Sequence, residues 1–81
     1  MLKIYGSMLC KDCVVCRKDL DQAGVAYEFL DFADNLMNLK IFLSFRDKES
    51  LFSKIRESGK IGIPCIVDDG GNVFLEWDRF L

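Results

Sequence analysis

Hydrophobic and polar positions in the first part of the chain follow two spacings, one typical of strands and one typical of helices. Residues 2–5 form a short apolar run that predicts a strand, and residues 11–23 repeat apolar side chains at helical spacing. Gly24 follows, where a left-handed residue commonly ends a helix. Residues 25–31 predict a second strand with apolar side chains on one side. Such a strand–helix–strand unit predicts two parallel strands joined by a right-handed crossover.

The second part of the chain predicts two more helices and a hairpin. Asp34 or Asn35 can cap a helix that breaks near residues 46–48, and Gly59 ends a second helical stretch. Residues 68–71, Asp-Asp-Gly-Gly, are a strong turn signal between two strands. The two strands are predicted at residues 61–67 and 72–76, and residues 77–81 have room for at most about one helical turn. The apolar face of the helix that Asp34 or Asn35 caps is marked by Leu36, Leu39, Phe42, Leu43 and Arg46 and is widened by Met37, Ile41 and Phe45.

Composition and charge narrow the classes of function. The 81 residues predict one small domain spanning residues 1–81, and a 51% hydrophobic content with seven Phe can supply its core. The net charge of −2 is close to balance, so we expect neither nucleic acid nor an acidic membrane as a partner. No apolar run has the length of a membrane span and no signal peptide is evident, so the expected compartment is cytoplasmic.

Three of the four cysteines, Cys10, Cys13 and Cys16, are close together at the start of the first predicted helix. Thiols this close cannot staple distant segments, and in a reducing compartment such a cluster indicates catalysis or metal binding. Cys10 and Cys13 form a Cys-x-x-Cys pair that can close a disulfide across one helical turn. Unpaired backbone N–H groups and the helix dipole favour the thiolate of Cys10, which is the reacting form.

A second feature lies about 50 residues later, where Pro64, the only proline, opens the third predicted strand. An X–Pro bond is of the kind that can be cis. A strand, a Cys-x-x-Cys pair, a helix and a later X–Pro that opens a hairpin are the pattern of the thioredoxin fold. Residues 4–13, Ile-Tyr-Gly-Ser-Met-Leu-Cys-Lys-Asp-Cys, together with Ile63-Pro64, resemble the glutaredoxins, and the resemblance covers nearly the whole chain. It implies an α/β, thioredoxin-like (glutaredoxin) fold with a four-stranded mixed sheet, helices on both faces, the order β-α-β-α-α-β-β and a truncated C-terminal helix.

The same resemblance implies a thiol–disulfide oxidoreductase that reduces protein or glutathione mixed disulfides. By this resemblance Cys10 is the nucleophile and Cys13 is the resolving thiol. The backbone of Ile63, beside a cis Pro64, pairs with the substrate as a short extra strand. No cofactor is expected to be bound, while glutathione is expected as co-substrate and a reductase as partner. The further binding residues are Lys11, which stabilises the thiolate, Asp12, which opposes it, and Asp78.

Two departures from the glutaredoxin pattern bear on the electron donor. Ser7 stands where the family usually has a basic residue, three positions before the nucleophile. Residues 75–78, Leu-Glu-Trp-Asp, stand where the family has two glycines followed by polar and acidic residues, so that Asp78 alone keeps part of the glutathione site. The redox fold is therefore better supported than glutathione as the reductant, and a protein driven by thioredoxin reductase fits the sequence as well.

Two other functions stay open at the level of the sequence. Three or four thiols without any His can form a thiolate-rich site that holds or delivers zinc, copper(I) or an iron–sulfur cluster. The other alternative is an interaction module with vestigial thiols, which wild-type-like function after Cys10→Ser would support. Cys16, beside Leu20 on the apolar helix face, and Cys65, directly after Pro64, are expected to be core residues.

Overall fold

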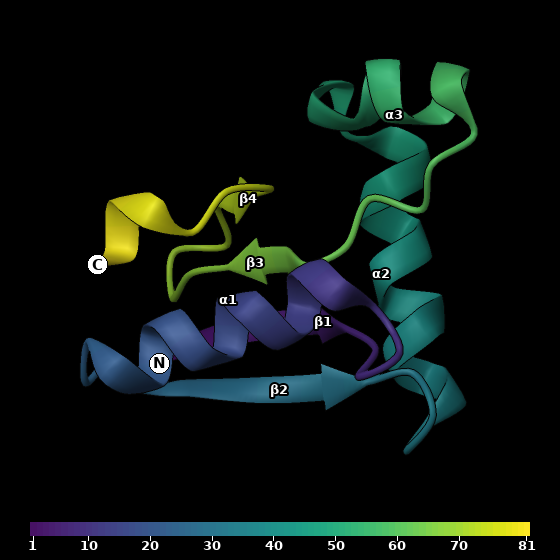
Figure 1. Cartoon of the computed structure of the whole chain (residues 1–81). Helices are drawn as coiled ribbons and strands as arrows, with labels where there is room; N and C mark the ends of the chain where they lie inside the picture. The colour runs from purple at the N-terminus through teal and green to yellow at the C-terminus, as the bar shows by residue number, and fades with distance from the viewer.

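The computed structural model describes residues 1–81 and has an α/β architecture, in which a four-stranded mixed sheet carries helices on both faces (Figure 1). The strand order is β2-β1-β3-β4. The order of elements expected from the sequence is confirmed. In chain order the elements are β1 (Leu2–Gly6), α1 (Lys11–Gln22), β2 (Tyr27–Asp31), α2 (Leu36–Lys48), the 3-10 turn η1 (Ser50–Phe52), α3 (Ser53–Ser58), β3 (Cys65–Val67), β4 (Val73–Phe74) and the 3-10 turn η2 (Asp78–Phe80).

Strand β1 organises the sheet, because it pairs with β2 in parallel and with β3 antiparallel. The predicted parallel pairing of the first two strands is therefore confirmed. Ile4 of β1 lies opposite Ile66 of β3, and Tyr5 lies opposite Cys65. Successive side chains of a strand point to opposite faces, so these two cross-strand pairs belong to two different layers of the core.

The first layer lies between the sheet and α1, which runs along the sheet in Figure 1. Ile4 and Ile66 pack there against Cys16 and Leu20 of α1, and all four side chains are fully buried. The helical spacing predicts Cys13, Cys16 and Leu20 on one face of this helix, and all three are buried. The partly buried side chains around this layer are Leu2, Val25, Tyr27, Phe29, Phe74, Trp77 and Phe80.

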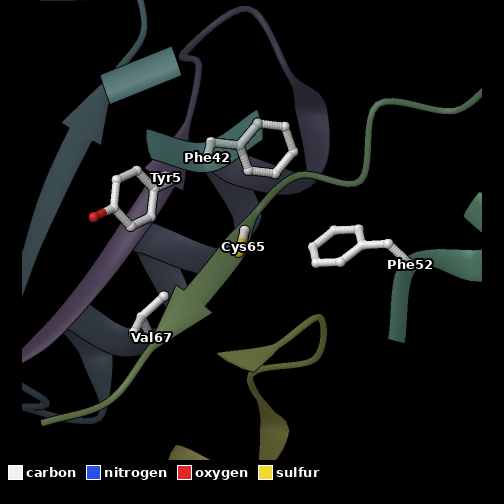
Figure 2. Packing of buried hydrophobic residues seen from close by; sticks show 5 residues of the cluster. All are labelled: Tyr5, Phe42, Phe52, Cys65 and Val67. Atoms are coloured by element: carbon white, nitrogen blue, oxygen red, sulfur yellow. The ribbon is translucent and has the colours of Figure 1, made fainter. Parts of the chain in front are cut away.

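The second layer lies on the opposite face, under α2 and η1. Figure 2 shows Tyr5 of β1 and Cys65 and Val67 of β3 on the side where the rings of Phe42 and Phe52 lie. The rings of Phe42 and Phe52 meet edge to face at 6.0 Å between centroids. This contact joins α2 to η1, the turn from which α3 continues.

The side of α2 that faces the sheet differs from the predicted one. Phe42 is buried and Phe45 packs against the same cluster, but Leu36 is 74% exposed and Leu43 is 37% exposed. The sheet and η1 cover only one side of this helix, and aromatic side chains bury the most apolar area there. The prediction that Leu36 and Leu43 lie on the inward face is therefore wrong.

The helix boundaries follow the local signals in the sequence. Gly24 and Gly59 follow α1 and α3 with φ of 71° and 75°, the left-handed region that glycine enters without steric cost. Of the two predicted caps, Asn35 is the one used, and its side chain accepts a hydrogen bond from the N–H of Met37 at 2.9 Å. None of the helices combines the length and hydropathy needed to cross a bilayer.

The hairpin at the end of the chain is shorter than predicted. Strand β3 begins at Cys65 rather than at residue 61, and β4 contains only Val73 and Phe74. Gly62 has a φ of 94°, which is outside the extended region, and Pro64 has no N–H to donate to a ladder. Residues 61–64 therefore form a loop, which we call the pocket loop together with residues 59 and 60.

Candidate active site

Cys10 lies at the N-terminal end of α1 and is its N-cap. Its backbone is extended, and its carbonyl accepts a hydrogen bond from the N–H of Val14 at 3.1 Å. The Cys10 Sγ accepts a hydrogen bond from the N–H of Cys13 at 3.4 Å, and the side chain is half-buried. The free N–H groups and the dipole of the helix bring partial positive charge to this sulfur.

Cys13 lies one turn further along α1 and is fully buried. Burial raises the pKa of its thiol to about 12; a backbone hydrogen bond from Ser7 acts in the opposite direction, and the neighbouring Cys10 sulfur raises the pKa further. Gly6, at the end of β1, leaves the space that this thiol occupies, because a Cβ at Gly6 would lie 2.6 Å from the Cys13 Sγ. The two sulfurs are therefore neighbours, of which one is reachable and the other is covered.

The third part of the site is the peptide between Ile63 and Pro64, which is cis, as predicted. The carbonyl oxygen of Ile63 lies 3.9 Å from the Cys10 Sγ and accepts a weak hydrogen bond from the thiol. Neither the N–H nor the carbonyl of Ile63 takes part in a backbone–backbone hydrogen bond. The backbone of Ile63 therefore has both a donor and an acceptor to offer a ligand beside the sulfur.

An open pocket of about 580 Å³ separates the start of α1 from the pocket loop. Four of the predicted site residues, Cys10, Asp12, Ile63 and Pro64, line it. Sequence reasoning missed the rest of its lining, which consists of Ile55, Gly59, Lys60, Ile61, Gly62 and Leu75.

Two predicted site residues lie outside this pocket. Lys11 is exposed and is not among the residues that line it. Asp78 lies in η2 and borders a separate hollow together with Asp19 and Trp77. Trp77 Nε1 donates a hydrogen bond to Asp19 Oδ2 at 2.9 Å, which ties the end of the chain to α1. The structure thus does not bring Asp78 to the pocket of Cys10.

The pocket loop is positioned by residues that are distant in the sequence. Gly62 passes so close to η1 that a Cβ would lie 2.9 Å from the ring of Phe52. Arg46 Nε donates to the carbonyl of Ile61 at 2.8 Å, and its Nη2 donates to the carbonyl of Lys60 at 2.6 Å. The glycine two positions before the proline was the available sequence signal for this loop, whereas no local pattern points to Arg46.

The other two thiols lie in the core, as predicted, and on opposite faces of the sheet. Cys16 belongs to the layer under α1, and Cys65 belongs to the layer under α2. Burial raises the pKa of Cys16 to about 11 and that of Cys65 to about 12. All four cysteines are free thiols, and no three Cys, Asp or Glu side chains are grouped so that they can hold a metal ion. The sheet therefore separates Cys16 from Cys65, so that the two cannot share a ligand.

Comparison with known proteins finds sequence similarity to a bacterial protein. No protein-family model matches the chain, and no solved structure matches it. A protein of Haemophilus influenzae, described as an uncharacterized protein, is 33% identical over 76 residues, which cover 94% of this chain and 88% of the relative. Identity at this level over nearly the whole of both chains means that this chain belongs to the same family as that Haemophilus influenzae protein.

Proposed function

We propose that the protein is a thiol–disulfide oxidoreductase with a thioredoxin-like, glutaredoxin-like fold, which reduces protein or glutathione mixed disulfides with Cys10 and Cys13. The observation that carries the proposal is the position of the Cys10 sulfur. It is reachable at a helix N-terminus, it has a covered thiol beside it, and the carbonyl of Ile63 lies 3.9 Å away. A pair that is reduced again after each turnover fits a reducing compartment such as the cytoplasm.

The reaction has two exchange steps that balance. The thiolate of Cys10 attacks one sulfur of a substrate disulfide, the substrate S–S bond breaks, and the leaving thiolate takes up a proton. Cys13 then attacks the Cys10 sulfur of the mixed disulfide and gives its own proton to the second leaving thiolate. The protein ends with a Cys10–Cys13 disulfide, and the substrate has gained two electrons and two protons. Two molecules of glutathione, or a dithiol reductase, return the pair to its reduced form.

The raised pKa of Cys13 suits the resolving thiol and not the nucleophile that attacks the substrate. With a pKa of about 12 this thiol is protonated at neutral pH, so it does not compete with Cys10 for an incoming disulfide. Its place behind Cys10 puts it next to the only sulfur it has to attack. A resolving thiol needs proximity more than ionisation, because the second step is intramolecular.

The surroundings of Cys10 favour a polypeptide substrate. The N–H and carbonyl of Ile63, which make no backbone–backbone hydrogen bond, can pair with an extended chain as with an added strand. Leu9, directly before Cys10, is 98% exposed, and Ile61 across the pocket is 58% exposed. Exposed apolar side chains on both sides of a reactive sulfur are typical of surfaces that bind a protein partner. Glutathione then serves as the electron donor or as the second half of a mixed disulfide.

The proposal is tested with the small aromatic disulfide dithiobis-nitrobenzoate and with a protein disulfide. The wild-type chain is expected to release about two nitrothiobenzoate ions at neutral pH, one per exchange step. Cys13→Ser is expected to release about one and to keep the other as a stable mixed disulfide on Cys10. Cys10→Ser is expected to retain less than about one hundredth of the wild-type rate with the protein disulfide.

Cys16→Ala is the matched control, because it removes a thiol from the same helix without touching the pair. It is expected to keep the stoichiometry of about two, whatever it costs in stability. Full activity of Cys10→Ser would contradict the proposal. A coupled assay that compares glutathione plus its reductase with thioredoxin reductase then identifies the electron donor.

A further inference from the structure

The pocket loop has few attachments of its own. Its residues belong to no helix or strand, and its one backbone–backbone hydrogen bond beyond Gly59 runs from the N–H of Lys60 to the carbonyl of Ile55 at 3.2 Å. Gly62 rests against Phe52, and Ile63 makes no backbone–backbone hydrogen bond. A segment with so little hydrogen bonding of its own keeps one conformation only if side chains from elsewhere hold it.

Arg46, in the last turn of α2, supplies such a hold. Its guanidinium donates to two consecutive carbonyls of the loop, that of Lys60 at 2.6 Å and that of Ile61 at 2.8 Å. A planar guanidinium can bind two neighbouring acceptors at once, which a single ammonium group does less well. The second of these carbonyls is only two residues before Ile63.

A second arginine, Arg56, holds the end of α2 that carries Arg46. Arg56 of α3 donates through Nη1 to the carbonyl of Arg46 and to the carbonyl of Glu49 at 3.0 Å. These are carbonyls at the C-terminal end of α2, which have no partner inside the helix. The two arginines thus connect α3, the end of α2 and the pocket loop in one series of hydrogen bonds.

We propose that Arg46 is a positioning residue for substrate capture. It holds the pocket loop so that the N–H and carbonyl of Ile63 face an incoming polypeptide beside Cys10, while it takes no part in the exchange at sulfur. This inference rests on the proposed function and adds to it a residue outside the Cys-x-x-Cys pair. Loss of Arg46 therefore weakens the binding of a peptide disulfide and leaves the reactivity of Cys10 unchanged.

The test compares Arg46→Met and Arg46→Lys with the wild-type chain on two substrates. One is a short peptide that carries a mixed disulfide on its own cysteine, and the other is dithiobis-nitrobenzoate, which has no backbone to pair with Ile63. For the peptide, Arg46→Met is expected to raise KM about tenfold with kcat within about twofold. The rate with the aromatic disulfide is expected to stay within about twofold of wild type, and the KM of Arg46→Lys for the peptide is expected to fall between those of Arg46→Met and the wild type.

Lys48→Met is the matched control, since Lys48 is an exposed cation in the same helical turn with no hydrogen-bond partner. It is expected to change the rate with neither substrate.

An equal fall in the rates with both substrates in Arg46→Met would overturn the inference, because it would mean a general loss of structure. An unchanged KM would also overturn it while leaving the proposed function intact. If the wild-type Cys10 does not react with the aromatic disulfide, the proposed function itself fails. If Arg46→Met does not fold, the same comparison of KM is made with Arg46→Lys, and an unchanged KM in that variant overturns the inference.

Discussion

The two walls of the pocket are held by interactions of different range. On the Cys10 side the hydrogen bonds that support the wall are local, from the N–H of Cys10 to the Ser7 carbonyl and from the N–H of Cys13 to the Cys10 Sγ. The weak hydrogen bond from the Cys10 thiol to the Ile63 carbonyl, at 3.9 Å, is the contact between the two walls. The pocket loop, in contrast, is held by Arg46 and Phe52, which come from elements earlier in the chain. Because the walls have separate supports, we expect that, in the proposed function, the reactivity of the sulfur and the capture of a substrate can be changed separately.

The largest expected effect is a fall in the free energy of unfolding at high pH, caused by the three buried thiols. Cys13, Cys16 and Cys65 have an ordinary pKa of 9.0, which burial raises to about 12, about 11 and about 12 in the folded protein. Between these values the unfolded chain binds fewer protons than the folded chain. The free energy of unfolding therefore keeps its full value below about pH 9 and falls above it, by up to about 4 kcal/mol per pH unit for three thiols.

Urea titrations between about pH 8 and pH 10 measure this decline. Cys65→Ala is the control, because it removes one of the three buried thiols and is expected to reduce the slope by about one third. A free energy of unfolding that is the same at both ends of this pH range would show that the buried thiols ionise as freely as in the unfolded chain.

A smaller effect, confined to the pocket loop, is expected from Gly62→Ala. The residue has a φ of 94°, and a Cβ would lie 2.9 Å from the Phe52 ring, so the loop has to move. The expected loss is about 2 kcal/mol in the free energy of unfolding, together with a higher KM for a peptide disulfide. The rate of Cys10 with dithiobis-nitrobenzoate is expected to stay the same, because its wall has its own supports.

Gly70→Ala is the matched control for this substitution. Its Cβ would meet only the flexible end of Asn72, at 3.3 Å, and the Asp68 carboxylate, at 3.5 Å, so the expected change in the free energy of unfolding is within about 0.5 kcal/mol. A slower reaction of Cys10 with the aromatic disulfide in Gly62→Ala would show that the two walls are coupled after all.

The same difference in range explains what the sequence was able to predict. The end of α1 at Gly24, the cap at Asn35 and the inward face of α1 were predicted correctly, because each depends on neighbours within a few residues. The parallel pairing of the first two strands and the hairpin at residues 68–71 were also predicted from the chain itself, whereas the complete four-stranded mixed sheet was expected from the resemblance to the glutaredoxins.

The errors lie where distant residues decide the conformation. Ile61 and Ile63 alternate as in a strand, yet the positive φ of Gly62 beside Phe52, the hydrogen bond from Arg46 and the lack of an N–H at Pro64 make residues 61–64 a loop. The inward side of α2 depends on how far the sheet and η1 extend, which the helical spacing does not contain. Asp78 was predicted near the pocket from a family pattern, whereas the Trp77–Asp19 hydrogen bond holds the end of the chain against α1.

The most direct test of the central claim is to find which cysteines of the folded protein become linked on mild oxidation. The reduced chain is treated with oxidised glutathione at neutral pH, quenched with acid and mapped by mass spectrometry. The account predicts a glutathione adduct on Cys10 that gives way to a Cys10–Cys13 disulfide, with Cys16 and Cys65 still free thiols. A first adduct on any other cysteine, or no oxidation of Cys10, would contradict it.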